Sequence, residues 1–432
     1  MTVLADLDEQ LREYAGRSPT SVTMKAHALA LPLSHVALRK AAAQADLSRG
    51  LGAGDRVRLE RQRMLIQLAD FLRGELLVRL ARKVAELDEF PDGLDAMPSV
   101  SVVRDWYVQS FVDIRDTPEP VCAETETAFY NVAKNIFARD APVLVKLARA
   151  VHEYKDKLAK EEEPQFEFGS LQHIHDTLDK FYTSRIGIRV LIGQYVELHD
   201  EDPPPGYVGL INRHTSPAEI CSVAAEDAKY VCRQAYGIAP EVVVEGRTDL
   251  TFPYIPSHLY YCMMELLKNS LRATVERHGV DDESGSGAKV LPPEIHELPR
   301  VRVVIAGNNC TEDVGIKISD EGGGIRRSHL PKIWSYLFTS ARPAFESQDG
   351  AFTSAGGNAK RPPPATSEAT GGAVNRARNR FIPMAGLGYG LPISRCYARY
   401  LGGDLTIVSL EGHGTDAYVH LPRLGDRAEP IH

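Results

Sequence analysis

Apolar residues recur every three or four positions across the first half of this sequence. The repeat is clearest from Leu65 to Leu87, where it predicts one long amphipathic helix. Three further helical stretches are expected at about 99–116, 126–160 and 170–199, separated by short segments that contain proline, glycine or acidic residues. Four long helices joined by short links are typical of an antiparallel four-helix bundle.

After the segment EDPPPGYVG the pattern changes to alternating helices and strands. Runs rich in β-branched residues predict strands at EVVVEG, RVRVVIA, DVGIKIS, DLTIVS and TDAYVHL. Helices expected at 217–235, 257–278 and 387–401 would cover one face of this mixed sheet. The predicted fold class is therefore α+β, with a helical domain over 1–205 and an α/β sandwich domain over 206–432.

The segment from Arg342 to Ile382 departs from both patterns. It is rich in Gly, Ser, Ala and Pro, which cannot offset chain entropy by apolar burial, so we interpret it as a flexible loop. Six basic and three acidic residues give it a local charge of +3. An inert insertion is the alternative, but the segment lies between two glycine-rich motifs.

Composition excludes several classes of protein. A net charge of −8 argues against general nucleic-acid binding, and no apolar run approaches the length of a membrane span. The start of the chain contains acidic residues and does not resemble a mitochondrial targeting peptide. Six scattered cysteines without CxxC pairs are typical of reduced thiols rather than of disulfides or zinc ligands.

Candidate chemistry begins on the expected helix 257–278. Glu265, Asn269 and Arg272 follow one another at i, i+4 and i+7, so they share one face of the helix. Such a face can be a plain solvated surface, or it can present an acid, an amide and a base to a ligand.

Two glycine-rich motifs follow. In DVGIKISDEGGGI, Asp320 ends a strand and can accept a hydrogen bond from an exocyclic amine, while the glycines behind it let the backbone approach a flat ring. In AGLGYGLPISR, three glycines precede a helix whose N-terminal N–H groups can face phosphates. Each motif alone has low specificity.

Together with GHGTDAYVHL, the order of these motifs resembles the GHKL ATPase family, which includes bacterial histidine kinases, gyrase and a heat-shock chaperone. The resemblance implies that Asn269 holds Mg²⁺, that Asp320 holds adenine, and that a lid at about 340–385 covers the phosphates. The other positions that the resemblance places around ATP or ADP are Arg272, Gly322, Gly324, Thr339, Ser340, Gly386, Leu387, Gly388, Tyr389, Gly390, Leu391 and Thr415.

Longer segments narrow the resemblance. ELLKNSLRATVERHG, GYGLPISRCYARYLGGDL and FLRGELLVRLARKVAEL are similar to the mitochondrial pyruvate dehydrogenase and branched-chain ketoacid dehydrogenase kinases. This implies a helical regulatory domain, a GHKL kinase domain, and serine phosphorylation with Glu265 as base beside Lys268. It also implies Mg²⁺ and K⁺ as cofactors, a lipoyl domain and a dehydrogenase alpha subunit as partners, a dimer, and the mitochondrial matrix.

In the helical domain, the same resemblance assigns Tyr107, Ser110, Arg185 and Arg189 to a pocket for an inhibitory ketoacid. Arg185 and Arg189 lie at i and i+4, so both can pair with one small carboxylate. Surface salt bridging is the alternative for these two arginines. A histidine of the family's allosteric helix is replaced here by Asp140.

The expected substrate is the alpha subunit of pyruvate dehydrogenase, which phosphorylation would inactivate. The branched-chain dehydrogenase is the alternative, because Tyr261 stands where pyruvate-type members carry a histidine. Two remoter alternatives are a histidine autokinase using His173 or His175, and an ATPase switch without phosphotransfer.

Overall fold

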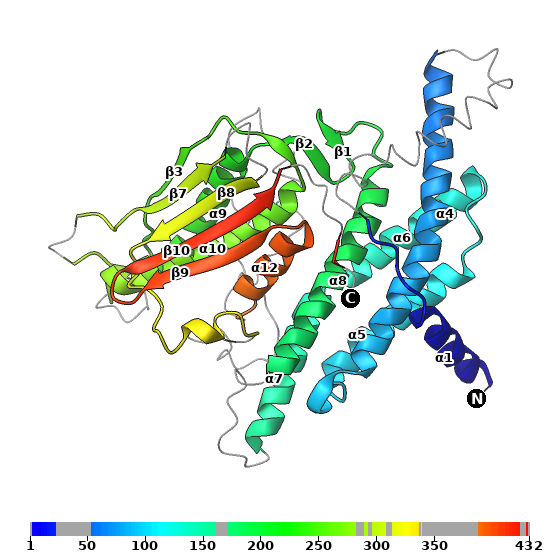
Figure 1. The fold of residues 1–432 in the computed structure, drawn as a ribbon, viewed down its shortest axis with the longest axis horizontal. Coiled ribbons are helices and arrows are strands. Elements are labelled where there is room, and N and C mark those ends of the chain that lie inside the picture. The colour runs from blue at the N-terminus through cyan, green and yellow to red at the C-terminus, as the bar shows by residue number, and fades with distance from the viewer. Residues whose placement is uncertain are drawn as a thin grey trace. The chain divides into compact units, whose positions relative to one another are not determined.

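The computed structural model describes residues 2–22, 53–160, 172–281, 289–292, 296–307, 313–336, 338, 388–423 and 429–430 (Figure 1). Its helices are α1 (Thr2–Ala15), α4 (Ala53–Asp88), η2 (Pro91–Gly93), α5 (Pro98–Asp116), α6 (Ala123–Asp140), α7 (Val143–Lys160), α8 (Gln172–Glu197), α9 (Pro217–Tyr236), α10 (Pro256–His278), η4 (Leu330–Lys332) and α12 (Gly390–Tyr400). Its strands are β1 (Tyr207–Val208), β2 (Ile211–Thr215), β3 (Val242–Gly246), β4 (Phe252–Tyr254), β5 (Val280–Asp281), β6 (Lys289–Val290), β7 (Val301–Ala306), β8 (Asp313–Asp320), β9 (Asp404–Leu410) and β10 (Gly414–Pro422).

The chain divides into two compact units. The helical unit comprises Met1–Ile211 together with Ala428–His432, and the sheet unit comprises Asn212–Arg427. The last residues of the chain therefore belong to the same unit as the first. The domain boundary expected after residue 205, and the regulatory and kinase roles of the two domains, stay predictions.

Helix α4 organises the helical unit. Its apolar stripe is buried as expected, with Leu72, Leu76 and Leu80 at 1% exposure or less. Helices α1, α5, α6 and α8 all pack against it. Within the described residues, no helix combines the length and the apolar character that crossing a membrane requires.

The prediction of a single helix over 126–160 was wrong. Helix α6 ends at Asp140, and α7 begins at Val143. The cause is Pro142, which has no N–H to continue the helical ladder. The N–H of Ala141 instead closes a tighter turn on the carbonyl of Ala138 at 3.2 Å. The carbonyl of Pro142 accepts from the N–H of Lys146 at 3.0 Å.

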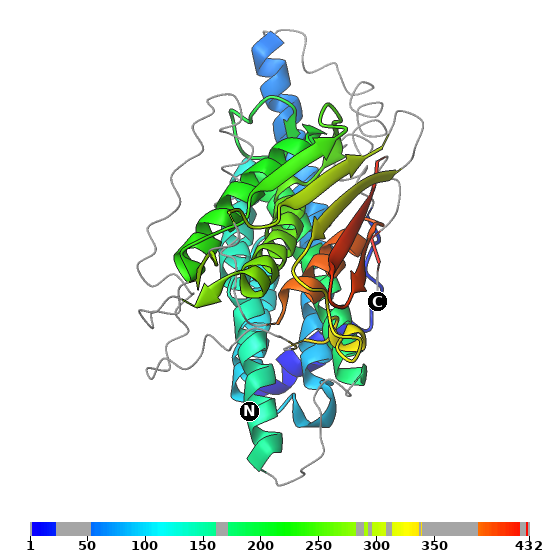
Figure 2. The ribbon, with the colours of Figure 1, turned by 90° about the vertical axis from the view of Figure 1, so that its left-hand side faces the viewer.

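The sheet unit is built on five strands in the order β3-β7-β8-β10-β9, parallel between β3 and β7 and antiparallel elsewhere. Figures 1 and 2 show helices α9, α10 and α12 against one face of this sheet. The five strands expected from the sequence are confirmed as β3, β7, β8, β9 and β10. In β7 and β8, alternate residues are buried. The helix expected from 387 begins at Gly390 within the described chain.

Candidate functional site

Helix α10 carries the polar face expected from the sequence. Pro256 occupies its first turn, where a missing N–H costs nothing, and Met263, Leu267 and Leu271 bury its apolar side. Glu265 is only 5% exposed, so it is not part of a solvated surface. Asn269 and Arg272 are half-buried.

The Glu265 carboxylate is held from two directions. Lys268 Nζ lies 2.6 Å from its Oε1 atom. Gly390, the first residue of α12, lies against its Oε2 atom so closely that a Cβ at this position would clash with the oxygen. The positive end of the α12 dipole therefore faces this carboxylate, and the absence of a Cβ at Gly390 leaves room for it.

Asp320 lies at the end of β8 and is 9% exposed. Its Oδ1 atom accepts hydrogen bonds from the backbone N–H of Gly322 at 2.9 Å and of Thr415 at 3.3 Å. The antiparallel register of β8 and β10 places Thr415 directly opposite Asp320. Burial raises the pKa of Asp320, and the hydrogen bonds from Gly322, Ser270 and Thr415 offset only part of that effect.

The glycines behind Asp320 are required by contacts within the protein. A Cβ on Gly322 would lie 2.5 Å from the Cβ of Ala273 on α10. Gly324 has a φ of +72°, and a Cβ there would clash with the carbonyl oxygen of Leu410. These contacts hold the turn against α10 and the β9–β10 connection, a reason that sequence reasoning missed because it assigned the glycines to a ligand ring.

The third motif is partly described. Gly388 has a φ of +74°, and Leu391 follows Gly390 in the first turn of α12. Tyr389 is buried with its ring 5.1 Å from that of Tyr336. The predicted contacts Thr339, Ser340, Gly386 and Leu387, and the predicted lid at about 340–385, lie outside the described residues.

The predicted magnesium site has one amide ligand rather than a cluster. In the described part of the chain, no three His, Cys, Asp or Glu side chains come together in a way that could hold a metal ion. Asn269 lies one helical turn after Glu265, so a cation held by its carbonyl oxygen would depend on phosphate and water oxygens for its other ligands.

In the helical unit, the two predicted pocket arginines share a carboxylate of the chain itself. Arg185 and Arg189 each lie 2.8 Å from Oδ2 of Asp140, and the hydroxyl of Tyr107 donates to Oδ1 at 2.9 Å. Ser110 is not part of this cluster, since its hydroxyl donates to the Trp106 carbonyl and accepts from Arg139. Arg185 and Asp140 are buried and Arg189 is half-buried, so simple surface salt bridging does not describe these contacts.

This cluster is electrostatically tight. Burial alone would raise the pKa of Asp140, but Arg185 and Arg189 outweigh burial and lower it. Burial and the nearby Asp140 raise the pKa of Tyr107 well above its usual value. Asp140 therefore holds a negative charge at the place where a ketoacid carboxylate would pair with both arginines, and ketoacid binding stays a prediction.

Two family models match the chain. Residues 53–212 match the mitochondrial branched-chain alpha-ketoacid dehydrogenase kinase model. Residues 254–425 match the histidine kinase-, DNA gyrase B-, and HSP90-like ATPase model, and this range contains every described residue of the candidate site in the sheet unit.

Curated relatives agree over most of the chain. The mitochondrial [pyruvate dehydrogenase (acetyl-transferring)] kinase of Arabidopsis thaliana is 44% identical over 370 residues, covering 86% of this chain and 88% of the relative. The corresponding kinase of Schizosaccharomyces pombe is 33% identical over 426 residues, with 84% and 89% covered. The human isozyme 3 is 34% identical over 370 residues, with 83% and 78% covered. This chain therefore belongs to the family of mitochondrial pyruvate dehydrogenase kinases, within the GHKL ATPases.

Proposed function

We propose that this chain transfers the γ-phosphate of ATP to a serine of the pyruvate dehydrogenase alpha subunit and thereby inactivates that enzyme. The main support for the proposal is the buried carboxylate of Glu265, which Lys268 holds in place. Glu265 lies one helical turn before Asn269. The relatives are named kinases of this dehydrogenase and are named mitochondrial, which favours the mitochondrial matrix as the place of action.

The site residues fit ATP and its metal. The carboxylate of Asp320 has acceptor capacity beyond the donors of its own backbone, so it can receive the exocyclic amine of adenine. The carbonyl oxygen of Asn269 suits Mg²⁺, which would neutralise charge on the phosphates when bound. Arg272, three residues beyond Asn269, adds positive charge to the same face of α10.

In the proposed step, the serine hydroxyl oxygen attacks the γ-phosphorus of ATP while Glu265 accepts the serine proton. The bond between the γ-phosphorus and the bridging oxygen breaks, and ADP leaves. Lys268 orients the carboxylate, and Gly390 leaves space for its second oxygen.

The base role is tested by Glu265→Gln, which keeps the shape of the side chain and removes its basicity. We expect the affinity for ATP to change little and phosphotransfer to fall by about 10²–10⁴-fold. The matched control is Glu276→Gln, which changes an exposed glutamate on the same helix. Phosphotransfer by Glu265→Gln at the wild-type rate would refute the role.

The choice of substrate is tested by offering Mg-ATP with the purified alpha subunit of pyruvate dehydrogenase or of the branched-chain dehydrogenase. The match of residues 53–212 to a branched-chain kinase model keeps the second protein as a candidate. Acid-stable phosphoserine, mapped by mass spectrometry, is expected on the pyruvate-type subunit. Label on neither subunit would sink the proposed function.

A histidine autokinase is disfavoured by the two candidate histidines. His175 is 3% exposed and cannot reach a phosphoryl donor, and His173 is paired with Asp92. Acid-labile phosphate on the kinase itself would revive this alternative. An ATPase switch would instead hydrolyse ATP and leave both alpha subunits unlabelled.

Four finer features belong to the same proposal. The helical unit acts as a four-helix regulatory bundle, built on α4, α5, α6 with α7, and α8. The protein binds a lipoyl domain of the dehydrogenase complex, dimerises, and uses K⁺ beside the nucleotide. Family resemblance supports all four.

A further inference from the structure

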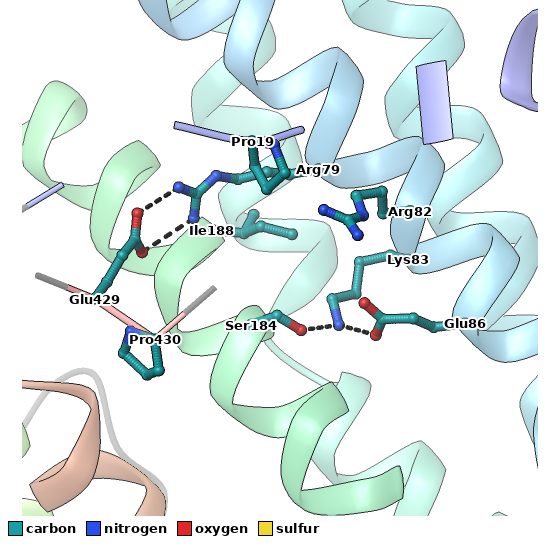
Figure 3. A pocket seen from close by; sticks show the side chains of 9 residues that line it. All are labelled: Pro19, Arg79, Arg82, Lys83, Glu86, Ser184, Ile188, Glu429 and Pro430. Atoms are coloured by element: carbon teal, nitrogen blue, oxygen red, sulfur yellow. Dashed lines mark hydrogen bonds and ion pairs between the residues drawn. The ribbon is translucent and has the colours of Figure 1, made fainter. Parts of the chain in front are cut away.

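A small cavity lies between helices α4 and α8 of the helical unit (Figure 3). Three cationic residues of α4 line it together with two carboxylates and with residues of α8 and the two end segments. The lining residues are Pro19, Arg79, Arg82, Lys83, Glu86, Ser184, Ile188, Glu429 and Pro430. Its volume of about 30 Å³ is room for roughly two water-sized groups. It can therefore hold a few non-hydrogen atoms and is far too small for a nucleotide.

Two of the three cations are already neutralised. Arg79 binds Glu75 at 2.6 Å, both carboxylate oxygens of Glu429, and the carbonyl of Thr20 at 2.7 Å. Lys83 donates to Glu86, to Ser184 and, at 3.1 Å, to the carbonyl of Phe181. The Lys83 side chain is 1% exposed, and this burial lowers its pKa.

Arg82 is the third cation, and it differs from Arg79 and Lys83 in its contacts. Within the described part of the chain, it makes no hydrogen bond and no ion pair, although its guanidinium group lines the cavity (Figure 3). Arg79 lies three residues before it and Lys83 directly after it. Glu75, Glu86 and Glu429 equal the cations in number, but all three bind Arg79 or Lys83 and leave the donors of Arg82 to the cavity.

We propose that this cavity receives two oxygen atoms of a small oxyanion, a carboxylate or inorganic phosphate, which the guanidinium group of Arg82 binds. A planar guanidinium offers paired N–H donors that match two oxygens of such an anion. Because Arg79 and Lys83 are paired with Glu429 and Glu86, the attraction for a negative ligand comes from Arg82. The site is separate from the Tyr107, Arg185 and Arg189 cluster, where Asp140 already supplies the carboxylate. It also does not depend on the proposed kinase activity.

The test follows the thermal unfolding of the full chain with increasing sodium acetate, sodium phosphate or, at matched ionic strength, sodium chloride. Saturating Mg-ADP is present throughout, so that phosphate does not report on the nucleotide site. A saturable rise in Tm of about 2–4 °C at ten times the dissociation constant is expected with acetate or phosphate and not with chloride. The arm that responds identifies the chemistry of the anion.

Variants assign the effect to the cavity. Arg82→Gln should abolish the saturable rise, and Arg82→Lys should weaken it, because an ammonium group cannot bind two oxygens in the same way. Arg63→Gln removes an exposed charge from the same helix and should respond as the wild type does. Equal responses in Arg82→Gln and Arg63→Gln, or equal responses to all three salts, would overturn the assignment.

Discussion

The carboxylate of Asp140 decides what the arginines of the helical unit can bind. It receives Arg185, Arg189 and Tyr107 at 2.8–2.9 Å in a buried place. Breaking such a pair is costly because the remaining charges stay buried without compensation. A ligand carboxylate would have to displace Asp140 before it could use the same donors.

Replacing Asp140 with Ala should expose this competition. We expect the free energy of unfolding to fall by about 3–5 kcal/mol, since Arg185 and Arg189 lose their counter-charge. Acetate or a small ketoacid should then raise the Tm of the variant more than that of the wild type. Differential scanning calorimetry with and without the acid measures both effects.

Asp113→Ala is the control, because Asp113 pairs with Arg139 at a half-exposed place, and its loss should cost about 1 kcal/mol or less.

The lowered pKa of Asp140 also determines how the free energy of unfolding changes with pH. Its contribution is complete above the pKa of an unfolded aspartate, about 4, and is lost as the pH falls through the folded pKa. A variant as stable as the wild type at pH 7 would contradict the account.

At the scale of elements, α4 shows which structural features follow from the local sequence pattern and which depend on long-range packing. Its apolar stripe could be predicted because helical periodicity is written in neighbouring residues. The strands around Asp320 and the helix bearing Glu265 could be predicted for the same reason.

What could not be predicted comes from packing between distant segments. The closure of Asp140 on arginines 45 and 49 positions later, and the contact of Gly390 with Glu265, depend on how helices meet rather than on periodicity. The break at Pro142 was within reach of sequence rules, but apolar spacing on both sides concealed it.

Gly74 offers a test at this scale. It is exposed in the middle of α4, and a Cβ there would meet no atom within 4 Å. Gly74→Ala should therefore stabilise the protein by about 0.5–1 kcal/mol, because glycine loses more backbone entropy in a helix. Calorimetry should show a higher Tm.

The matched comparison is Gly322→Ala, which would force the turn after Asp320 away from α10 and should lower both the Tm and the affinity for ATP. A lower Tm for Gly74→Ala would contradict the open space that the structure shows around this position.

At the scale of the whole molecule, the two ends of the chain meet on α4. The backbone N–H of Glu429 donates to the Val22 carbonyl at 3.1 Å, and the N–H of Val22 donates to the Glu429 carboxylate at 3.2 Å. Arg79 binds that carboxylate as well as the carbonyl of Thr20. The buried Arg79 thus binds two segments that are far apart in the sequence. Ser21 and Glu429, for example, are 408 positions apart.

Glu429→Gln should weaken the contacts of residue 429 with Arg79 and Val22 while keeping the shape of the side chain. We expect a loss of about 1–3 kcal/mol, because Arg79 keeps Glu75 but loses its second carboxylate. Hydrogen exchange at the amide of Val22 should accelerate, while exchange in the sheet unit should not change. Glu89→Gln, at an exposed position of the helical unit, should leave exchange at Val22 as it is. Unchanged exchange at Val22 in Glu429→Gln would contradict the role of the junction.

The division of the chain also has a consequence for its biosynthesis. Because the helical unit takes residues from both sides of the sheet unit, a ribosome delivers all of the sheet unit before it delivers Glu429. More than two hundred residues are synthesised between the helices of this unit and Glu429. During that time Arg79 lacks one of its two carboxylate partners. The helical unit therefore stays incomplete until the residues that follow the sheet unit have been made.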